Sequence, residues 1–305
     1  FRHCQETEAA LRAIQYAAPS TVEDAVAILA EHGSDARMLA GGTDLIVQVR
    51  EDARDTGVFV DAKKIPELMD LSVNADGSTT LGAAVPCHQL YNNAQFAASY
   101  PAVVDAARII GSTGIQGRAS VGGNLCNSGP AGDTIPPLIV HSAICNIAGP
   151  DGERTVAVED FCTAPGRNVL ADGELLVSLT LPKPPAGSGS HYLRFIPRNE
   201  MDIAVVGAGA SLVLDGESIT AARISLGAVA PTPLFVQAAG DALIGLTADE
   251  DSFAVAADIA RDAASPIDDM RGTIAHRKQL SYVLTQRALR GARARAQGGS
   301  PTNGH

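Results

Sequence analysis

Residues 120–133 read Ser-Val-Gly-Gly-Asn-Leu-Cys-Asn-Ser-Gly-Pro-Ala-Gly-Asp. The glycines, the proline and the side chains that bond readily with their own backbone disfavour an ordinary helix or strand. We therefore expect a winding loop, and the apolar runs on either side argue against a disordered one. Because glycine has no Cβ, such a backbone can approach a ligand closely and present N–H groups to it. The stretch is interpreted as half of a cofactor cradle.

The other half of the cradle is expected at residues 38–44, Met-Leu-Ala-Gly-Gly-Thr-Asp. The apolar run 36–39 leads into a Gly-Gly pair, and Thr43-Asp44 could cap the apolar segment 45–49. A strand, a tight turn and a helix start would place several free N–H groups on one spot, which favours phosphate. No Lys or Arg lies between Met38 and Val49. N–H groups, each worth roughly 1.5–3 kcal/mol against a charged oxygen, would hold a diphosphate without a lysine.

Each of these stretches taken singly can be a structural turn, because Gly-Gly turns are common. The occurrence of both stretches in one chain is specific enough to indicate a protein family. Ala-Gly-Gly-Thr-Asp-Leu at residues 40–45, followed by Ser-Val-Gly-Gly-Asn-x-x-x-x-x-Pro-x-x-Asp at 120–133, resembles the FAD-binding medium subunit of the molybdenum hydroxylases. This is the family of xanthine dehydrogenase and aerobic carbon monoxide dehydrogenase. The resemblance extends over about residues 14–291.

The resemblance implies an α+β protein with the FAD-binding fold of the vanillyl-alcohol oxidase type. That fold has two α/β subdomains and is followed by a C-terminal domain of a small antiparallel sheet plus helices. The segment Pro182-Lys-Pro-Pro-Ala-Gly-Ser-Gly-Ser190 is rich in Pro and Gly and has little to bury, as expected of a linker. We expect an N-terminal extension at 1–13, an FAD-binding domain at 14–181 split near residue 62, a linker at 182–190, a C-terminal domain with a three-stranded sheet at 191–296, and a tail at 297–305.

The two glycine-rich stretches supply most of the FAD contacts that the resemblance implies. In the family the first loop wraps the diphosphate, and the second follows the ribityl chain towards the flavin ring. The implied contacts in the two loops are Met38, Leu39, Ala40, Gly41, Gly42, Thr43, Asp44, Leu45, Ser120, Gly122, Gly123, Asn124, Asn127 and Asp133. Asp133 would bond ribityl hydroxyl groups; the alternative is that it caps the helix expected near Pro136.

Four further FAD contacts follow from the resemblance alone, and each has a structural alternative. Ile110 and Gly111 match positions that pack against the flavin, or they simply end a helix. Leu176 matches a residue that covers the ring, although a Leu in a strand commonly belongs to the core. Arg194 matches a position that is often basic and near the flavin, or it is a solvated strand charge.

Composition limits the classes of partner. The 305 residues contain 23 basic and 34 acidic side chains, which give a net charge of −11. This charge argues against nucleic acid and anionic membrane surfaces as partners. The longest uncharged apolar run, 203–214, is far shorter than the ~20 residues that cross a bilayer. The start of the chain has acidic residues and no apolar core of a signal peptide, and we expect a soluble, cytoplasmic protein.

We expect no metal site and no catalytic side chain in this chain. Five cysteines are too widely spaced for a Cys-x-x-Cys site and are expected to be free thiols. Seven histidines show no metal-ligand spacing. Cys126 is interpreted as a small filler within the second loop. Gly207-Ala-Gly209 lacks the third glycine of a dinucleotide fingerprint and is expected in a strand.

The resemblance implies an electron-transfer role, because a flavin carries the chemistry while the protein sets orientation and access. FAD would take electrons from two 2Fe-2S clusters on a small partner subunit. A large partner subunit would hold the molybdenum-pterin cofactor and oxidise the substrate. The implied assembly is a dimer of heterotrimers, and the final acceptor is NAD, oxygen, a quinone or another molecule. Two alternatives stay open: an FAD-free scaffold subunit of the same complex, and a stand-alone flavin oxidase.

Overall fold

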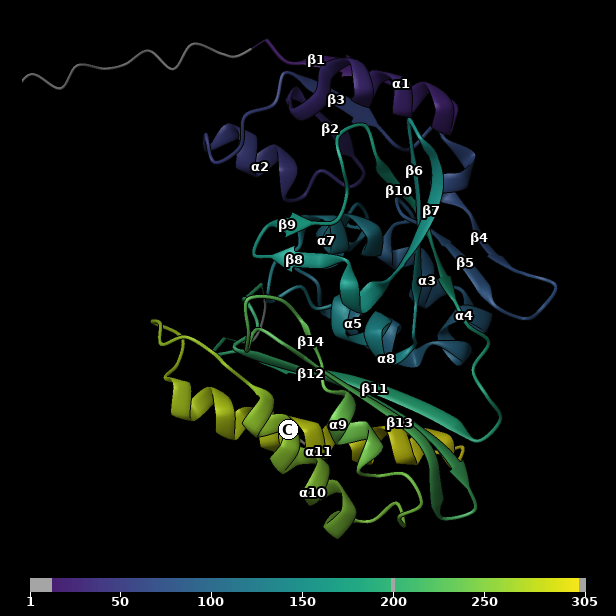
Figure 1. Ribbon diagram of the computed structural model, residues 1–305, viewed down its shortest axis with the longest axis vertical. Coiled ribbons are helices and arrows are strands. Elements are labelled where there is room, and N and C mark those ends of the chain that lie inside the picture. Colours follow the sequence, from purple (N-terminus) through teal and green to yellow (C-terminus); the bar gives the residue numbers. More distant parts are fainter. Residues whose placement is uncertain (1–12, 199–200, 302–305) are drawn as a thin grey trace, which may run out of the picture.

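The computed structural model describes residues 13–198 and 201–301. The expected N-terminal extension, apart from residue 13, lies outside the described residues, as do residues 302–305 of the expected tail. The chain forms three stacked parts, which Figure 1 shows from top to bottom in chain order. Each part is built on its own sheet, and the chain passes from the middle sheet to the lowest one through residues 182–187.

The first part is a parallel three-stranded sheet in the order β1-β3-β2. The helix α1 (Val22–His32) covers it with Ala25 and Leu29, which are buried. The cap of this helix is Thr21, whose Oγ1 accepts a hydrogen bond from the N–H of Asp24 at 3.1 Å. The other elements are β1 (Gln15–Ala17), β2 (Ala36–Leu39), α2 (Leu45–Arg50) and β3 (Val58–Asp61).

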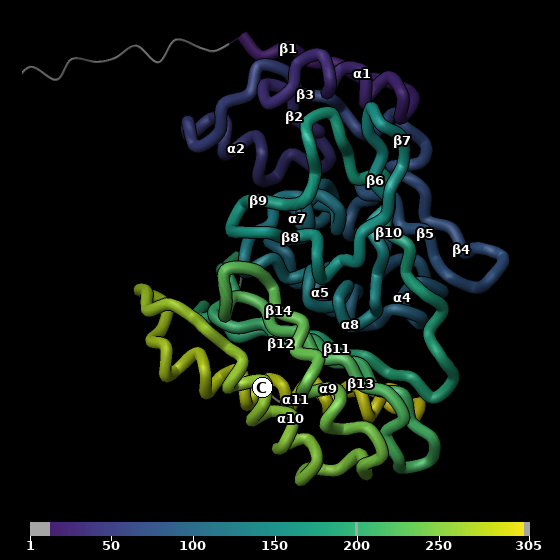
Figure 2. The backbone as a smooth tube through the Cα atoms, in the orientation of Figure 1, coloured from purple at the N-terminus to yellow at the C-terminus, as the bar shows by residue number. Residues whose placement is uncertain are grey.

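The middle part is an antiparallel five-stranded sheet in the order β4-β5-β10-β6-β7. Helices pack on one of its faces, and the largest buried apolar cluster lies between them and the sheet (Figure 2). The strands are β4 (Leu71–Val73), β5 (Thr79–Gly82), β6 (Ile144–Gly149), β7 (Gly152–Ala157) and β10 (Leu175–Leu181). The helices are α3 (Cys87–Asn92), α4 (Ala94–Ser99), α5 (Pro101–Ile109), α6 (Thr113–Gln116), α7 (Val121–Asn127) and α8 (Ile135–Val140).

The prediction of a winding loop over residues 120–133 was wrong for its first half, which forms the helix α7. The Oγ of Ser120 caps this helix by accepting a hydrogen bond from the N–H of Gly123 at 3.1 Å. Leu125 is fully buried in the core. Ser128 takes a left-handed conformation with φ of 51° and ends the helix. The cap and the buried leucine outweigh the poor helix propensity of the glycines.

The third part is an antiparallel sheet of four strands in the order β11-β12-β13-β14, where three were expected. The fourth strand, β14, forms where the Phe235 ring packs under the Arg223 guanidinium at 3.9 Å and residue 234 pairs with Leu226. Gly207 and Gly209 lie in a strand, as predicted. The elements are β11 (Ser188–Phe195), β12 (Val206–Asp215), β13 (Ser218–Gly227), β14 (Leu234–Phe235), α9 (Gln237–Asp241), α10 (Glu250–Ala263) and α11 (Ile274–Ala296).

Strand β11 begins at Ser188, inside the segment expected as a linker up to residue 190. Its first residues pair with the far end of β12, where Gly189 lies opposite Leu212. One face of this sheet packs on α9 and α11, against which α10 lies, and the other faces α5 and α8 of the middle part (Figure 1). The C-terminal sheet is therefore docked directly against the helices that flank the second glycine-rich stretch.

This docking interface contains a histidine that gives a testable pH dependence. The Nε2 of His141 lies 2.9 Å from the Oγ of Ser190, and its ring packs edge-on against Tyr100. Burial lowers the pKa of His141 from 6.5 to about 4. Between these two values the unfolded chain binds a proton that the folded chain does not, so stability falls as the pH drops through this window.

We expect His141→Gln, which can keep the hydrogen bond to Ser190, to reduce this pH dependence by roughly 2 kcal/mol. Urea unfolding of both proteins at pH 7 and pH 4.5 measures the effect. The expectation would be contradicted if the free energy of unfolding fell by the same amount in wild type and variant between the two pH values.

Candidate functional site

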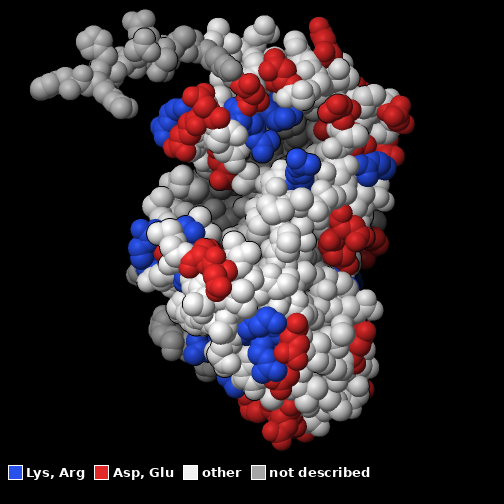
Figure 3. All heavy atoms as spheres, turned by 60° about the vertical axis from the view of Figure 1, so that its left-hand side comes forward, with Lys and Arg blue, Asp and Glu red and all other residues white. Residues whose placement is uncertain are grey.

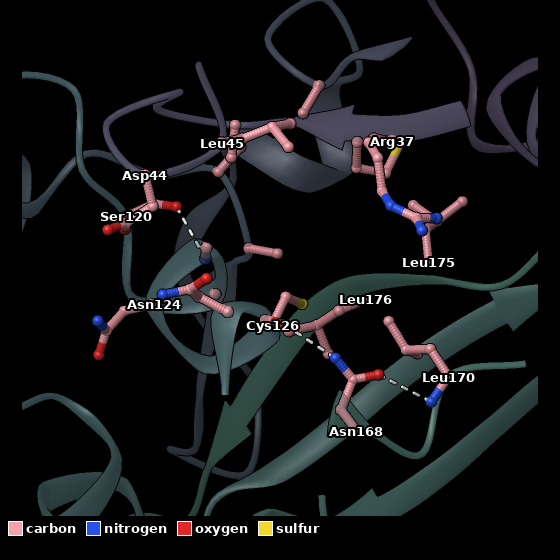
Figure 4. A pocket seen from close by; sticks show the side chains of 18 of the residues that line it. Arg37, Asp44, Leu45, Ser120, Asn124, Cys126, Asn168, Leu170, Leu175 and Leu176 are labelled. Atoms are coloured by element: carbon pink, nitrogen blue, oxygen red, sulfur yellow. Dashed lines mark hydrogen bonds between the residues drawn. The ribbon is translucent and has the colours of Figure 1, made fainter. Parts of the chain in front are cut away.

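A cavity of about 650 Å³ opens between the first and middle parts of the fold. Its size lies in the range of small-molecule and cofactor sites. Figure 3 shows a recess in this face of the molecule, with a group of Lys and Arg side chains beside it. In Figure 4, Leu45 and Arg37 lie on one wall, with Leu176 and Asn168 across from them and Asp44, Ser120 and Asn124 at one end.

The cavity brings together most of the residues predicted to contact FAD. The predicted residues that line it are Met38, Ala40, Gly41, Gly42, Thr43, Asp44, Leu45, Ile110, Ser120, Gly122, Gly123, Asn124, Asn127 and Leu176. Four predicted residues lie outside this lining, namely Leu39, Gly111, Asp133 and Arg194. The two glycine-rich stretches therefore form one site, while the FAD contacts of the individual residues stay predictions.

Two glycines allow the walls of the cavity to meet. A Cβ on Gly41 would lie 2.8 Å from the carbonyl carbon of Arg118 and closer still to its oxygen. A Cβ on Gly122 would lie 2.6 Å from the Cα of Ala83. Both contacts are with backbone atoms, which cannot swing aside as a flexible side chain can. Glycine is needed at these positions because another stretch of backbone passes against each of them.

The first stretch presents backbone donors to the cavity. Within the described ranges, no group of the chain accepts a hydrogen bond from the N–H of Gly42, Thr43, Asp44 or Leu45. Asp44 stands before α2, but its side chain does not cap the helix, unlike the expectation from sequence. Burial raises the pKa of Asp44, which lowers the cost of placing an anion beside its carboxyl group. Free N–H groups of this kind suit the oxygens of a phosphate.

The second stretch is tied to the first and to a third wall. The Nε2 of Gln48 in α2 donates to the Oδ1 of Asn127 in α7 at 2.9 Å. The Nδ2 of Asn168 donates to the carbonyl of Cys126 at 2.9 Å. The Oδ1 of Asn124 accepts a hydrogen bond from the Oγ1 of Thr134 at 2.8 Å, which fixes the amide in place. The lining is thus held by side-chain contacts between segments that are far apart in sequence.

The third wall of the cavity was not predicted from the sequence. It consists of the hairpin of β8 (Cys162–Ala164) and β9 (Arg167–Asn168) and of the segment that leads into β10. The lining residues from this wall are Thr163, Gly166, Arg167, Asn168, Leu170, Ala171, Asp172, Gly173, Glu174 and Leu175. No motif marks these residues, so only the folded chain identifies them.

Cationic side chains also line the cavity and were not predicted. Arg37, Arg54 and Arg167 all take part in the lining. Arg37 donates to the carbonyl of Ala36 at 3.1 Å, while its buried Nε has no partner among the described residues. Burial, and after it the charge of Arg54, lowers the pKa of Arg37. An unpartnered guanidinium nitrogen and a second nearby cation favour a negatively charged ligand.

Cys126 lines the cavity, where the sequence suggested only a small filler. Burial, and after it the charge of Cys162, raises the pKa of its thiol to about 12. A thiol with so high a pKa stays protonated near neutral pH and is a poor nucleophile. Cys126 therefore contributes shape rather than covalent chemistry.

Asp133 and Arg194, predicted as separate FAD contacts, bind each other in the structure. The Nη1 of Arg194 lies 2.5 Å from the Oδ2 of Asp133, and both side chains are less than a tenth exposed. The Tyr192 hydroxyl donates to the other carboxylate oxygen at 2.8 Å. Arg194 also donates to the carbonyl of Ile109 at 2.9 Å. This cluster connects the C-terminal sheet to the segments on either side of the second stretch.

The arrangement fits FAD. Glycine residues lie where the walls of the cavity approach each other. The free N–H groups and the arginines suit a diphosphate. Apolar surface for a ring is supplied by Leu45, Leu175 and Leu176. None of the helices in residues 13–198 and 201–301 is long and apolar enough to span a membrane. In the same part of the chain, no group of three His, Cys, Asp or Glu side chains is placed to hold a metal ion.

Two family models match the chain. Residues 12–184 match the FAD binding domain in molybdopterin dehydrogenase, and residues 191–292 match the C-terminal domain of the CO dehydrogenase flavoprotein. The chain is 31% identical over 283 residues to the carbon monoxide dehydrogenase medium chain of Afipia carboxidovorans. The aligned region covers 92% of this chain and 97% of that protein.

A second relative and a solved structure agree with this match. The putative xanthine dehydrogenase FAD-binding subunit of Escherichia coli is also 31% identical, over 93% of this chain and 97% of that protein. Reconstituted CO dehydrogenase from Oligotropha carboxidovorans superimposes with a TM-score of 0.89 at 30% identity, over 92% of this chain and 98% of that one. The equal identities to the two relatives do not favour either substrate.

Proposed function

The chain belongs to the family of FAD-binding medium subunits of the molybdenum hydroxylases, and from this premise we propose that it binds FAD in the cavity described above and transfers electrons within an oxidoreductase complex. The observation that carries the proposal is the set of N–H groups at Gly42, Thr43, Asp44 and Leu45, which have no partner among the described residues and belong to residues that line a cavity of cofactor size. FAD supplies the redox chemistry when it is bound.

The protein contributes binding, orientation and access. The N–H groups of the first stretch hold the diphosphate, and Arg37 and Arg54 add positive charge to the same cavity. Ser120, Asn124 and Asn127 offer polar groups along the second stretch, where a ribityl chain would lie. Leu176 and Ile110 line the cavity and exclude water from a flavin ring.

The predicted domain division and assembly are part of this proposal. An FAD-binding domain over 14–181 and a C-terminal domain over 191–296 serve as one flavoprotein subunit. Its partners are a large subunit with a molybdenum-pterin cofactor and a small subunit with two 2Fe-2S clusters, assembled as a dimer of heterotrimers in the cytoplasm. Relatives named as a medium chain and as an FAD-binding subunit support a multi-subunit enzyme.

Two other functions are weaker. A scaffold subunit without FAD would not need the glycines at which a Cβ would clash with neighbouring backbone. It would also not need an open cavity beside these glycines. A stand-alone oxidase of the vanillyl-alcohol oxidase type has a large substrate-cap domain. Here the C-terminal part is a four-stranded sheet with three helices among the residues that the structure describes, and it packs beneath the middle part.

The absorption spectrum of the protein purified with its partners tests the proposal. We expect FAD that is stoichiometric, bleached by dithionite and released unchanged by acid, together with iron–sulfur absorbance from the partner subunits. Colourless protein that still holds its partners would support the scaffold. Oxidation of a small alcohol or phenol by the isolated chain would instead support the stand-alone oxidase.

A further inference from the structure

Two cationic side chains outside the cavity donate hydrogen bonds to the Gly-Gly turn. The Nζ of Lys63 donates to the carbonyl oxygen of Ala40. The Nε of Arg118 donates to the carbonyl oxygen of Gly41 at 3.2 Å. Lys63 follows β3 and Arg118 precedes α7, so they reach the turn from different parts of the chain. Ala40 and Gly41 line the cavity, whereas both cations lie outside its lining.

The geometry of the peptide bond links these two hydrogen bonds to the direction of the backbone N–H groups of the turn. In a trans peptide unit the carbonyl and the N–H point in opposite directions. Because the carbonyls of Ala40 and Gly41 point towards Lys63 and Arg118, the N–H groups of Gly41 and Gly42 point away from these cations. No described residue accepts a hydrogen bond from either N–H. Both donors are therefore available on the cavity side of the turn.

Lys63 is held in place by a buried carboxylate. The Oδ1 of Asp61 accepts a hydrogen bond from the backbone N–H of Lys63 at 3.1 Å and lies 3.7 Å from its Nζ. The Tyr16 hydroxyl donates to the other oxygen of Asp61 at 2.5 Å. The position of the ammonium group is thus set by β1 and β3 as well as by the turn.

Among the residues that the structure describes, the charges in this cluster are not balanced. Burial lowers the pKa of Lys63, the charge of Arg118 lowers it further, and Asp61 opposes both effects. Two cations therefore share one carboxylate. An anion on the opposite side of the Ala40–Gly41 turn would balance the remaining positive charge.

We propose that Lys63 and Arg118 are positioning residues for a diphosphate bound in the cavity, which they serve by orienting and polarising the two peptide units of the Gly-Gly turn without touching the ligand. A hydrogen bond to a peptide carbonyl strengthens the N–H of the same unit as a donor. The arrangement supplies positive charge to a stretch that itself has no Lys or Arg between Met38 and Val49. The inference rests on the proposed binding of FAD to this site.

The chain offers a matched control for Lys63. Lys64 is the next residue, carries the same charge and is exposed. We expect Lys63→Met to weaken FAD binding to the flavin-stripped full-length chain about tenfold, and Lys64→Met to change it less than about twofold. Quenching of flavin fluorescence on titration measures both. We expect Lys63→Arg to restore most of the lost affinity, because it keeps the charge and a donor.

Salt dependence separates this role from a merely structural one. If Lys63 acts through its charge, the FAD affinity of Lys63→Met should fall less steeply with added NaCl than that of wild type. Competition by ADP, which carries the diphosphate without a flavin, should weaken in the same variant by a similar factor. Equal FAD affinity and salt dependence in Lys63→Met and Lys64→Met would overturn the inference alone. Failure of the wild-type chain to take up FAD would overturn the proposed function instead.

Discussion

Gly41→Ala is expected to weaken FAD binding by about 100-fold or more. This factor corresponds to the loss of two or more charge-assisted N–H contacts. The new Cβ would lie 2.8 Å from the Arg118 carbonyl carbon, and the obstacle is backbone. Either the Gly-Gly turn or the segment before α7 has to move. Each movement breaks the bond between Arg118 and the Gly41 carbonyl and displaces the free N–H groups that follow.

Gly114→Ala is a matched control for this substitution. A Cβ there would meet only the Oγ of Ser112 at 3.8 Å, an ordinary contact. Flavin fluorescence titration measures affinity, and thermal unfolding of the flavin-free proteins measures the cost of the clash, which we expect at about 1–3 kcal/mol for Gly41→Ala. Wild-type FAD affinity in Gly41→Ala would show that the turn does not bind the cofactor.

Asp133→Asn is expected to lower the free energy of unfolding by about 3–5 kcal/mol, because it leaves the charge of Arg194 buried without its partner. Burial raises the pKa of Asp133, and the charge of Arg194 followed by the hydrogen bond from Tyr192 acts against that rise. The geometry favours the carboxylate, since both of its oxygens accept hydrogen bonds, from Tyr192 at 2.8 Å and Arg194 at 2.5 Å.

Urea unfolding of the flavin-free chain tests this expectation. A suitable control is Asp258→Asn, whose carboxylate pairs with Arg261 while about half exposed. Loss of that pair should cost less than about 1 kcal/mol. Arg194→Met in the Asp133→Asn background should cost less than it does alone, because the pair is already broken. Unchanged stability with lost FAD binding would instead support the predicted contact between Asp133 and the ribityl chain.

The sequence determined the family, the α+β fold and the two stretches that line one end of the cavity. These features follow from two glycine-rich motifs, each of which is a local pattern, and from the occurrence of both in one chain. A Gly-Gly pair after an apolar strand marks a close backbone approach. The family resemblance and the cofactor drew on the same local motifs and were confirmed by the comparisons.

Tertiary structure decided what depends on contacts between distant residues. It turned residues 121–127 into a helix because Leu125 is buried, and it paired Asp133 with Arg194 across 61 positions of sequence. It also placed the β8–β9 hairpin on the cavity, and Lys63 and Arg118 behind the turn. None of these residues has a local signature, because a charge or a polar side chain acquires its role only from the partner that the fold brings to it.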